Sequence, residues 1–145
     1  MINSIMLVDD ENLFHLVFED ACSLLDISLS FEALDSSDEA DKLFKKWFPN
    51  DPKHERPECV FVDLNIVGSS FDGIELIRKI NYEYGNGVVI GIISSSSDVQ
   101  EIEKAKAVGA QFWIIKSDEI EPRLEEFKKD YDGYKSKTAK FKIYK

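Results

Sequence analysis

Short strand-like segments alternate with amphipathic segments along most of this chain. The strand-like segments lie at residues 5–8, 29–33, 59–64, 88–93 and 112–115. The segments between them repeat apolar residues every three or four positions, as helices do, and lie at residues 13–25, 36–48, 74–80, 97–108 and 122–127. Strands that each alternate with a helix predict right-handed crossovers and a parallel sheet covered on both faces. The predicted fold class is therefore α/β, an open doubly wound sheet of five strands with five helices.

The length and the distribution of charge set the domain organisation. A chain of 145 residues of which 43% are hydrophobic fits one globular domain with a core of its own. We place this domain at residues 1–130 and a basic C-terminal tail at 131–145, because residues 135–145 carry five lysines and no acid. Residues 138–145 alternate between apolar and polar, so the tail is either a short strand at a sheet edge or a disordered segment. Residues 49–57 are predicted to form a long polar loop.

Composition excludes several classes of function. The net charge of −10 argues against a nucleic-acid partner, because such binding depends on clustered lysine and arginine, so a protein partner is expected. No apolar run approaches the roughly 20 residues of a membrane span, and no signal segment is expected. Cys22 and Cys59 show neither paired nor metal-binding spacing, which is typical of buried thiols in a reducing compartment. We therefore expect a cytoplasmic protein without membrane attachment.

Four charged residues stand where predicted strands end. Asp9 and Asp10 follow the first strand, and Lys116 follows the fifth. Asp63 is the last residue but one of the third strand. Open α/β sheets bind ligands beyond the carboxyl ends of their strands, where these four residues should meet. Three carboxylates suit a hard divalent cation such as Mg²⁺, and a lysine offers a point charge for phosphate. The constellation predicts phosphoryl chemistry on an aspartate.

Asp63 is the predicted nucleophile of this site. It stands at the end of the strand that is predicted to be the most central of the sheet. A carboxylate can form an acyl phosphate when a metal neutralises the negative charge of the incoming phosphoryl group. We predict that Asp10 holds Mg²⁺ beside it, with Asp9 acting through water and the backbone carbonyl of Asn65 as a further ligand.

Two other strand-end residues are assigned to the phosphoryl group. Lys116 is expected to pair with Asp63 before the reaction and with phosphate afterwards. The hydroxyl of Ser94, at the end of the fourth strand, is expected to donate a hydrogen bond to a phosphate oxygen. A site of this kind works by positioning and electrostatics.

These motifs resemble the response-regulator receiver domain of two-component signalling, over about residues 3 to 130. The matching elements are Val8-Asp9-Asp10-Glu11, Val62-Asp63-Leu64, Asp72-Gly73-Ile74-Glu75-Leu76, Ser94, Gly109-Ala110 and Lys116. The resemblance implies a flavodoxin-like sheet of strand order 2-1-3-4-5. It also implies a phosphoprotein of the single-domain type, which acts without an attached effector and turns over no separate substrate.

The resemblance further implies roles and partners. Asp63 would receive phosphate from a sensor histidine kinase or a histidine phosphotransfer protein, Asp9 and Asp10 would support Mg²⁺, and Lys116 would contact the phosphate. Ser94 would be the switch hydroxyl. A downstream protein or a second copy would then bind the altered face made by the fourth helix, the fifth strand and the fifth helix.

The sequence departs from the family pattern at four points, which affect the expected conformational switch more than the expected phosphoryl transfer. Val67 and Ser117 stand where the family usually has proline, so the usual reason for a cis peptide after the lysine is absent. Two extra residues between Asp63 and Asp72 predict a longer and more mobile loop. Trp113 occupies the aromatic switch position, and its bulk is expected to limit its inward rotation.

Two alternatives stay open. A docking module that keeps the fold without using phosphate is compatible with the departures, although the intact acids argue against it. A phosphohydrolase with an aspartyl-phosphate intermediate ranks lower. Enzymes similar to the haloacid dehalogenases use Asp-x-Asp after the first strand, whereas Asp9 and Asp10 are adjacent here and Asn65 stands two residues after Asp63.

Overall fold

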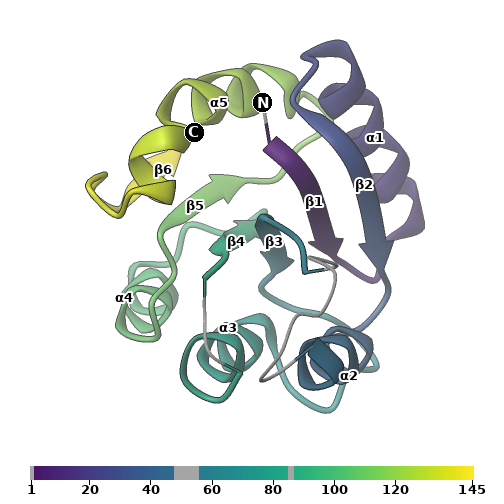
Figure 1. Cartoon of the computed structure of the whole chain (residues 1–145), viewed down its shortest axis with the longest axis vertical. Helices are drawn as coiled ribbons and strands as arrows, with labels where there is room; N and C mark the ends of the chain where they lie inside the picture. The colour runs from purple at the N-terminus through teal and green to yellow at the C-terminus, as the bar shows by residue number, and fades with distance from the viewer. Residues whose placement is uncertain (1, 48–55, 85–86) are drawn as a thin grey trace.

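The chain folds into one parallel sheet with helices on both faces (Figure 1). The computed structural model describes residues 2–47, 56–84 and 87–145. The strands are β1 (Ile2–Val8), β2 (Ser28–Leu34), β3 (Cys59–Asp63), β4 (Val89–Ser94), β5 (Phe112–Ile115) and β6 (Lys142–Tyr144). The helices are α1 (Asn12–Leu24), α2 (Ser37–Trp47), α3 (Gly73–Tyr82), α4 (Val99–Ala107) and α5 (Glu121–Lys135). The loop predicted over residues 49–57 lies mostly outside the described residues.

The sheet has the strand order β2-β1-β3-β4-β5-β6, and every neighbouring pair is parallel. The first five strands confirm the predicted order 2-1-3-4-5. Every residue of β3 and β4 is buried, as expected for central strands with helices on both faces. Because all strands run the same way, their carboxyl ends meet at one edge, where the predicted site residues lie.

Two helical layers enclose the sheet. The helices α1 and α5 cover one face, and α2, α3 and α4 cover the other (Figure 1). Beneath α1 and α5 lies an aromatic core in which the ring of Phe61 is 5.2 Å from that of Phe127 and 5.3 Å from that of Phe112. Gly91 leaves room for this core, since a Cβ there would lie 2.6 Å from the ring of Phe112. None of the described helices is long and apolar enough to span a membrane.

Side-chain caps place the helices that begin beside the site. Asp72 accepts a hydrogen bond from the backbone N–H of Glu75 at 2.8 Å and begins α3. Asp98 accepts from the N–H of Gln100 at 2.8 Å and begins α4. Acidic caps hold both helix starts close to the ends of β3 and β4.

The predicted division at residue 130 does not follow the structure. The helix α5 runs through this position to Lys135, and β6 then pairs with β5 as a sixth strand of the same sheet. Residues 131–145 are therefore packed onto the domain. Of the two possibilities for the tail, the structure shows the strand at a sheet edge.

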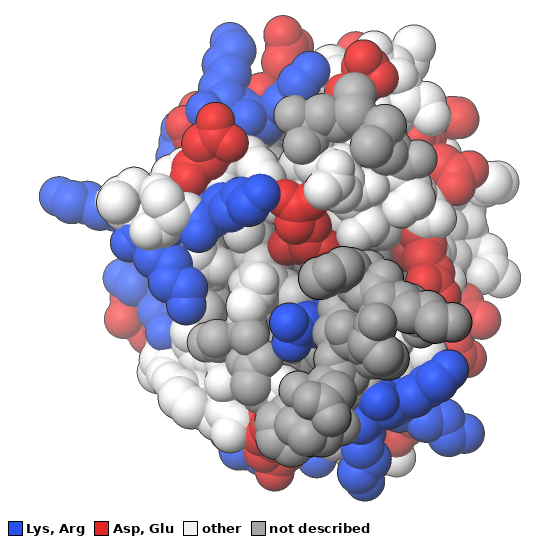
Figure 2. Space-filling view, viewed as in Figure 1, with Lys and Arg blue, Asp and Glu red and all other residues white. Residues whose placement is uncertain are grey.

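Lysines of the former tail are paired with acids of the domain. Lys and Arg side chains gather over the region of α5 and β6, with acidic side chains among them (Figure 2). The Nζ atom of Lys135 lies 2.9 Å from a carboxylate oxygen of Glu58, and that of Lys142 lies 2.7 Å from one of Glu126. Through these ion pairs, part of the positive charge of residues 131–145 binds acidic side chains of residues 1–130.

Candidate phosphoryl-acceptor and metal site

Three carboxylates meet at the carboxyl ends of β1 and β3. Asp9 and Asp10 directly follow β1, and Asp63 is the last residue of β3. Asp9, Asp10 and Asp63 each offer an oxygen, and these three atoms all lie within 4.8 Å of one another. Asp9 and Asp63 are buried, while Asp10 reaches solvent. The structure thus brings the predicted acids together in the arrangement that a single cation needs.

The electrostatics of this cluster favour a cation. Burial, together with the charge of Asp9, raises the pKa of Asp63 to about 7, although Lys116 acts in the opposite direction. A divalent ion between the carboxylates would remove this repulsion. Oxygen donors of this type suit Mg²⁺, which needs few protein carboxylates because it keeps several waters. The donor set therefore fits the predicted ion.

The ammonium group of Lys116 lies closer to Asp9 and Glu11 than to Asp63, its predicted partner. Its Nζ atom lies 2.8 Å from Asp9 and 3.0 Å from Glu11, but 3.7 Å from Asp63. Burial lowers the pKa of Lys116, but the hydrogen bond to Asp9 and the charge of Asp63 outweigh it, so the net shift is upward. The ammonium group therefore stays charged, and it is hydrogen-bonded to Asp9 and Glu11 while standing near Asp63.

Three residues at the start of α1 complete the surroundings of Lys116 and were not predicted. Glu11 accepts its second hydrogen bond, and the ring of Phe14 lies 4.6 Å from its Nζ atom. His15 is hydrogen-bonded through Nε2 to the backbone oxygen of Asp9. The acidic run after β1 was the available signal for Glu11. Phe14 and His15 carried none, because their positions fit an ordinary helix equally well.

Ser94 and Trp113 are both hydrogen-bonded to the backbone of Ser96. Ser94 is buried at the end of β4, and its Oγ accepts a hydrogen bond from the N–H of Ser96 at 3.1 Å. The indole N–H of Trp113 donates to the carbonyl of Ser96 at 3.0 Å. Trp113 is fully buried, so its indole lies inside the core, and the expected limit on its rotation during switching stays a prediction. The core beside β4 and β5 has room for the whole indole ring.

The loop between β3 and α3 carries Asn65 and is tied to α2. Its Ser69 accepts a hydrogen bond from the N–H of Ser37 at 3.0 Å, and Ser37 donates to the carbonyl of Phe71 at 2.6 Å. The N–H of Ser70 donates to a side-chain oxygen of Asp38 at 2.8 Å. These bonds tie the loop to α2, and the expected mobility of the loop stays a prediction.

Asn65 and Val67 of this loop both face water. Val67 exposes 78% of its surface, so the residue in the usual proline position is free of packing constraints. Asn65 is exposed as well, two residues beyond the carboxylate of Asp63. Its backbone carbonyl as a metal ligand stays a prediction.

Gly73 lets the start of α3 lie directly against the backbone at the end of β3. A Cβ at this position would lie 2.2 Å from the backbone oxygen of Asp63. We expect Gly73→Ala to lower the free energy of unfolding by about 3 kcal/mol, because helix and strand end must separate. Urea unfolding measures this. As a control, Gly68→Ala should cost about 1 kcal/mol, from its positive φ of 81° alone, since no atom lies within 4 Å. Equal costs would contradict the close approach.

The comparisons agree with this geometry. The family model for the response regulator receiver domain matches residues 5–125. A comparison with curated proteins gives no match. Among solved structures, the chain is similar to a two-component response regulator from Cytophaga hutchinsonii, with a TM-score of 0.74 and 19% identity over 92% of this chain and 96% of that one.

Two further solved structures share the fold. The phosphorylated cyanobacterial phytochrome response regulator RcpA has a TM-score of 0.70 and 18% identity over 96% of this chain and 97% of its own. The Mn²⁺-bound form of response regulator Rcp1 has a TM-score of 0.69 and 16% identity over 94% and 96%. At these identities the likeness shows the fold alone, whereas the family model covers most of the sequence. The chain therefore belongs to the response regulator receiver domain family of two-component signalling.

Proposed function

We propose that Asp63 accepts a phosphoryl group from a phosphohistidine of a sensor histidine kinase or a histidine phosphotransfer protein. The phosphorylated chain then presents a changed surface to a downstream protein or to a second copy. In this proposal the chain turns over only its own phosphate and acts in the cytoplasm, in line with its two buried free thiols. Action without an attached effector stays a prediction.

One observation carries the proposal. Three carboxylates gather within 4.8 Å, and one of them, Asp63, stands 3.7 Å from the ammonium of Lys116. Ser94 ends the neighbouring strand β4, which pairs with β3 up to Asp63. A nucleophile, a cation site, a positive charge and a hydroxyl donor thus lie at adjacent strand ends.

The proposed reaction moves one phosphoryl group. A carboxylate oxygen of Asp63 forms a bond to phosphorus while the bond from phosphorus to the imidazole nitrogen of the donor breaks, and the nitrogen leaves with its electron pair. Mg²⁺ at Asp9, Asp10, Asp63 and the carbonyl of Asn65 would offset the negative charge that meets there. Lys116 is already charged and needs only to turn from Glu11 towards the new phosphate. The hydroxyl of Ser94 donates to a phosphate oxygen.

An apolar stripe on α1 supports a protein as the phosphoryl donor. Leu13, Leu16 and Leu24 share one side of this helix and expose 68%, 62% and 73% of their surface. The helix begins beside the site, since Glu11 and Phe14 contact Lys116. A donor protein that covers these leucines would bring its histidine to the open side of the carboxylate cluster.

The proposal is tested by the mass of the intact protein after incubation with Mg²⁺ and phosphoramidate, whose N–P bond resembles that of phosphohistidine. We expect the native chain to gain one phosphate and to lose it in hydroxylamine. Asp63→Asn should gain none, and EDTA should suppress the gain in the native chain. The matched variant Asp20→Asn, on the exposed side of α1, should behave as the native chain does.

Two results would contradict the proposal. A gain that persists in Asp63→Asn would place the phosphate on another residue. The lack of any gain from phosphoramidate, acetyl phosphate and a phosphorylated histidine kinase, with Mg²⁺ binding confirmed separately, would favour a docking module that does not use phosphate.

A further inference from the structure

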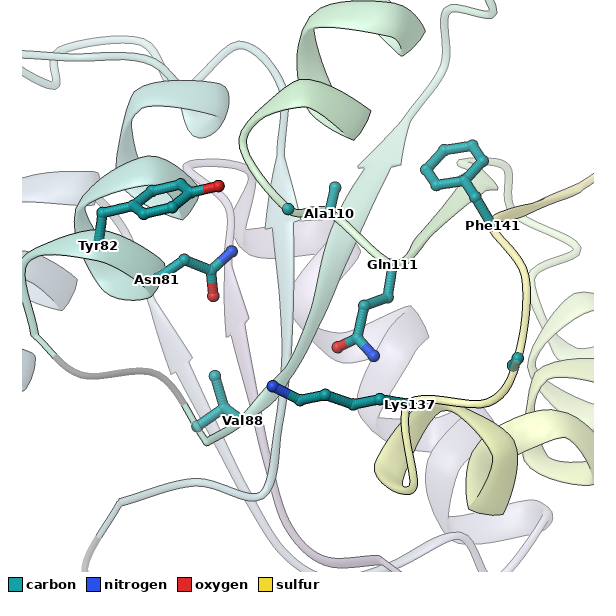
Figure 3. A pocket seen from close by; sticks show the side chains of 9 residues that line it. Asn81, Tyr82, Val88, Ala110, Gln111, Lys137 and Phe141 are labelled. Atoms are coloured by element: carbon teal, nitrogen blue, oxygen red, sulfur yellow. The ribbon is translucent and has the colours of Figure 1, made fainter.

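A pocket lies at the end of the sheet opposite the phosphoryl site, where the parallel strands begin. The end of α3, the starts of β4 and β5, and the turn that follows α5 line it (Figure 3). Its volume is about 360 Å³. Pockets that bind small molecules begin at about 300 Å³, so this one has room for a ligand of modest size.

The pocket has an apolar floor and aromatic sides. Val88 and Ala110 are buried and form part of the floor. The rings of Tyr82 and Phe141 stand on opposite sides of the pocket (Figure 3). The ammonium of Lys106 lies 5.3 Å from the centre of the Phe141 ring, which adds positive charge on that side. A planar apolar molecule therefore suits the space between the two rings.

Two amide side chains in the pocket are held in fixed positions. The amide nitrogen of Asn81 donates to the carbonyl of Val108 at 2.9 Å. Gln111 accepts from the N–H of Ile90 at 3.2 Å and donates to the carbonyl of Tyr134 at 2.9 Å. The side-chain oxygen of Asn81 points into the pocket (Figure 3) and has no hydrogen-bond donor among the residues that the structure describes. It can accept one from a ligand without any rearrangement.

Lys137 occupies a backbone position that favours glycine. Its φ is 62°, in the left-handed region. Its N–H donates to the carbonyl of Tyr134 at 3.1 Å, and that of Thr138 donates to the carbonyl of Gly133 at 2.9 Å, which together form the Schellman motif that ends α5. Glycine is the usual residue at this point of the motif, and a residue with a Cβ there costs stability. A long side chain kept at such a position suggests a use for that side chain.

The ammonium of Lys137 lacks a partner among the described residues. The side chain extends across the pocket towards Val88 (Figure 3). Glu58, which lines a smaller pocket on the other side of Lys137, is already bound by Lys135 at 2.9 Å and by Tyr131 at 3.1 Å. None of the described residues that line the larger pocket is acidic, although the chain carries a net charge of −10. The pocket is therefore complementary to an anion.

We infer that this pocket binds a small aromatic carboxylate. The carboxylate pairs with the ammonium of Lys137, and the ring lies between Tyr82 and Phe141. An N–H or O–H of the ligand donates to the side-chain oxygen of Asn81. The pocket lies at the opposite end of the strands from Asp63, so the inference does not depend on phosphoryl transfer.

The test is a titration of the full chain with indole-3-acetate, 4-hydroxybenzoate and nicotinate, followed through the amide NMR signals. We expect at least one of them to shift the signals of Gly109, Gln111 and Ala139, with a dissociation constant of about 1 mM, as is usual for a ligand of this size. The corresponding alcohol, which has the same ring without the charge, should bind about tenfold more weakly or less tightly still.

Three variants identify the group that binds the carboxylate. Lys137→Gly should weaken binding about tenfold or more, whereas Lys137→Arg should retain it, because the positive charge stays. The matched variant Lys140→Gly removes a neighbouring exposed lysine that does not line this pocket, and it should bind as the native chain does. The thermal midpoint of Lys137→Gly should not fall below that of the native chain, since glycine suits the backbone there. Loss of binding would then not reflect loss of the fold.

Four results would overturn the inference. The first is that none of the three acids shifts these signals at about 10 mM, well above the expected dissociation constant. The second is equal affinity for the acid and its alcohol, and the third is unchanged affinity in Lys137→Gly. A lower thermal midpoint for Lys137→Gly would show that the lysine stabilises the turn itself, which would remove the reason to assign it to a ligand.

Discussion

Asp63→Asn is expected to make the metal-free protein more stable than the native chain. Burial and the charge of Asp9 raise the pKa of Asp63 from 3.8 to about 7. Because the folded state holds this proton more tightly than the unfolded state, the native chain loses stability as the pH rises through that range. Each pKa unit corresponds to about 1.4 kcal/mol, so the variant should gain up to about 4 kcal/mol at pH 8. At pH 5 the gain should be less than half as large.

Urea unfolding in EDTA at the two pH values measures this effect. Asp20→Asn, which removes an exposed carboxylate of α1, should change stability by less than about 0.5 kcal/mol at either pH. Mg²⁺ should stabilise the native chain and not the variant, which reverses their order. A variant less stable than the native chain at pH 8 in EDTA would show that the carboxylate cluster is not strained in the way the distances indicate.

Lys116→Met is expected to destabilise the protein by about 3 kcal/mol at pH 8, because it leaves a buried charge without its partner. Asp9 is fully buried and lies 2.8 Å from the ammonium that the variant lacks. The upward pKa shift of Lys116 stabilises the fold below pH 10.5, so the lysine's contribution is present throughout the range from pH 5 to pH 8. The loss should grow with pH, since Asp63 also becomes charged.

A double-mutant cycle separates the partners of Lys116. In the Lys116→Met background, Asp63→Asn should restore more stability than it adds to the native chain, because the repulsion from Asp63 is no longer offset. Lys104→Met serves as the control, since Lys104 is 65% exposed and lies 3.9 Å from Glu101. It should cost less than about 0.5 kcal/mol. Equal losses for the two lysine variants would mean that solvent screens the site.

The sequence predicted the fold and the meeting of the acids for one physical reason. Parallel strands end at the same edge, so a charged residue placed directly after a strand, as Asp9 and Lys116 are, has little freedom of position. Asp63 ends a strand buried on both faces, which fixes it equally well. The strand order beyond simple alternation came from the resemblance to the receiver family, since periodicity alone does not order strands in a sheet.

Details that depend on side-chain direction were not predictable. The turn of Lys116 towards Asp9 and Glu11, and away from Asp63, is decided by differences in distance of less than about 1 Å, which the spacing of residues in the sequence does not encode. The burial of Trp113 depends on the space left between β5 and α4. Three residues of β6 form too short a run to separate a strand from a disordered tail. The missed boundary at residue 130 follows from the same ambiguity.

The most direct test of the central claim locates the phosphate on the chain. Borohydride reduces an aspartyl phosphate to homoserine, so the native protein is treated with Mg²⁺ and acetyl phosphate, reduced, digested and sequenced by mass spectrometry. Asp63 at the end of β3 should be the position converted to homoserine, and omission of Mg²⁺ should suppress the conversion. Homoserine at Asp9, at Asp10 or at a residue outside the cluster, with Asp63 unchanged, would contradict the assignment of the acceptor.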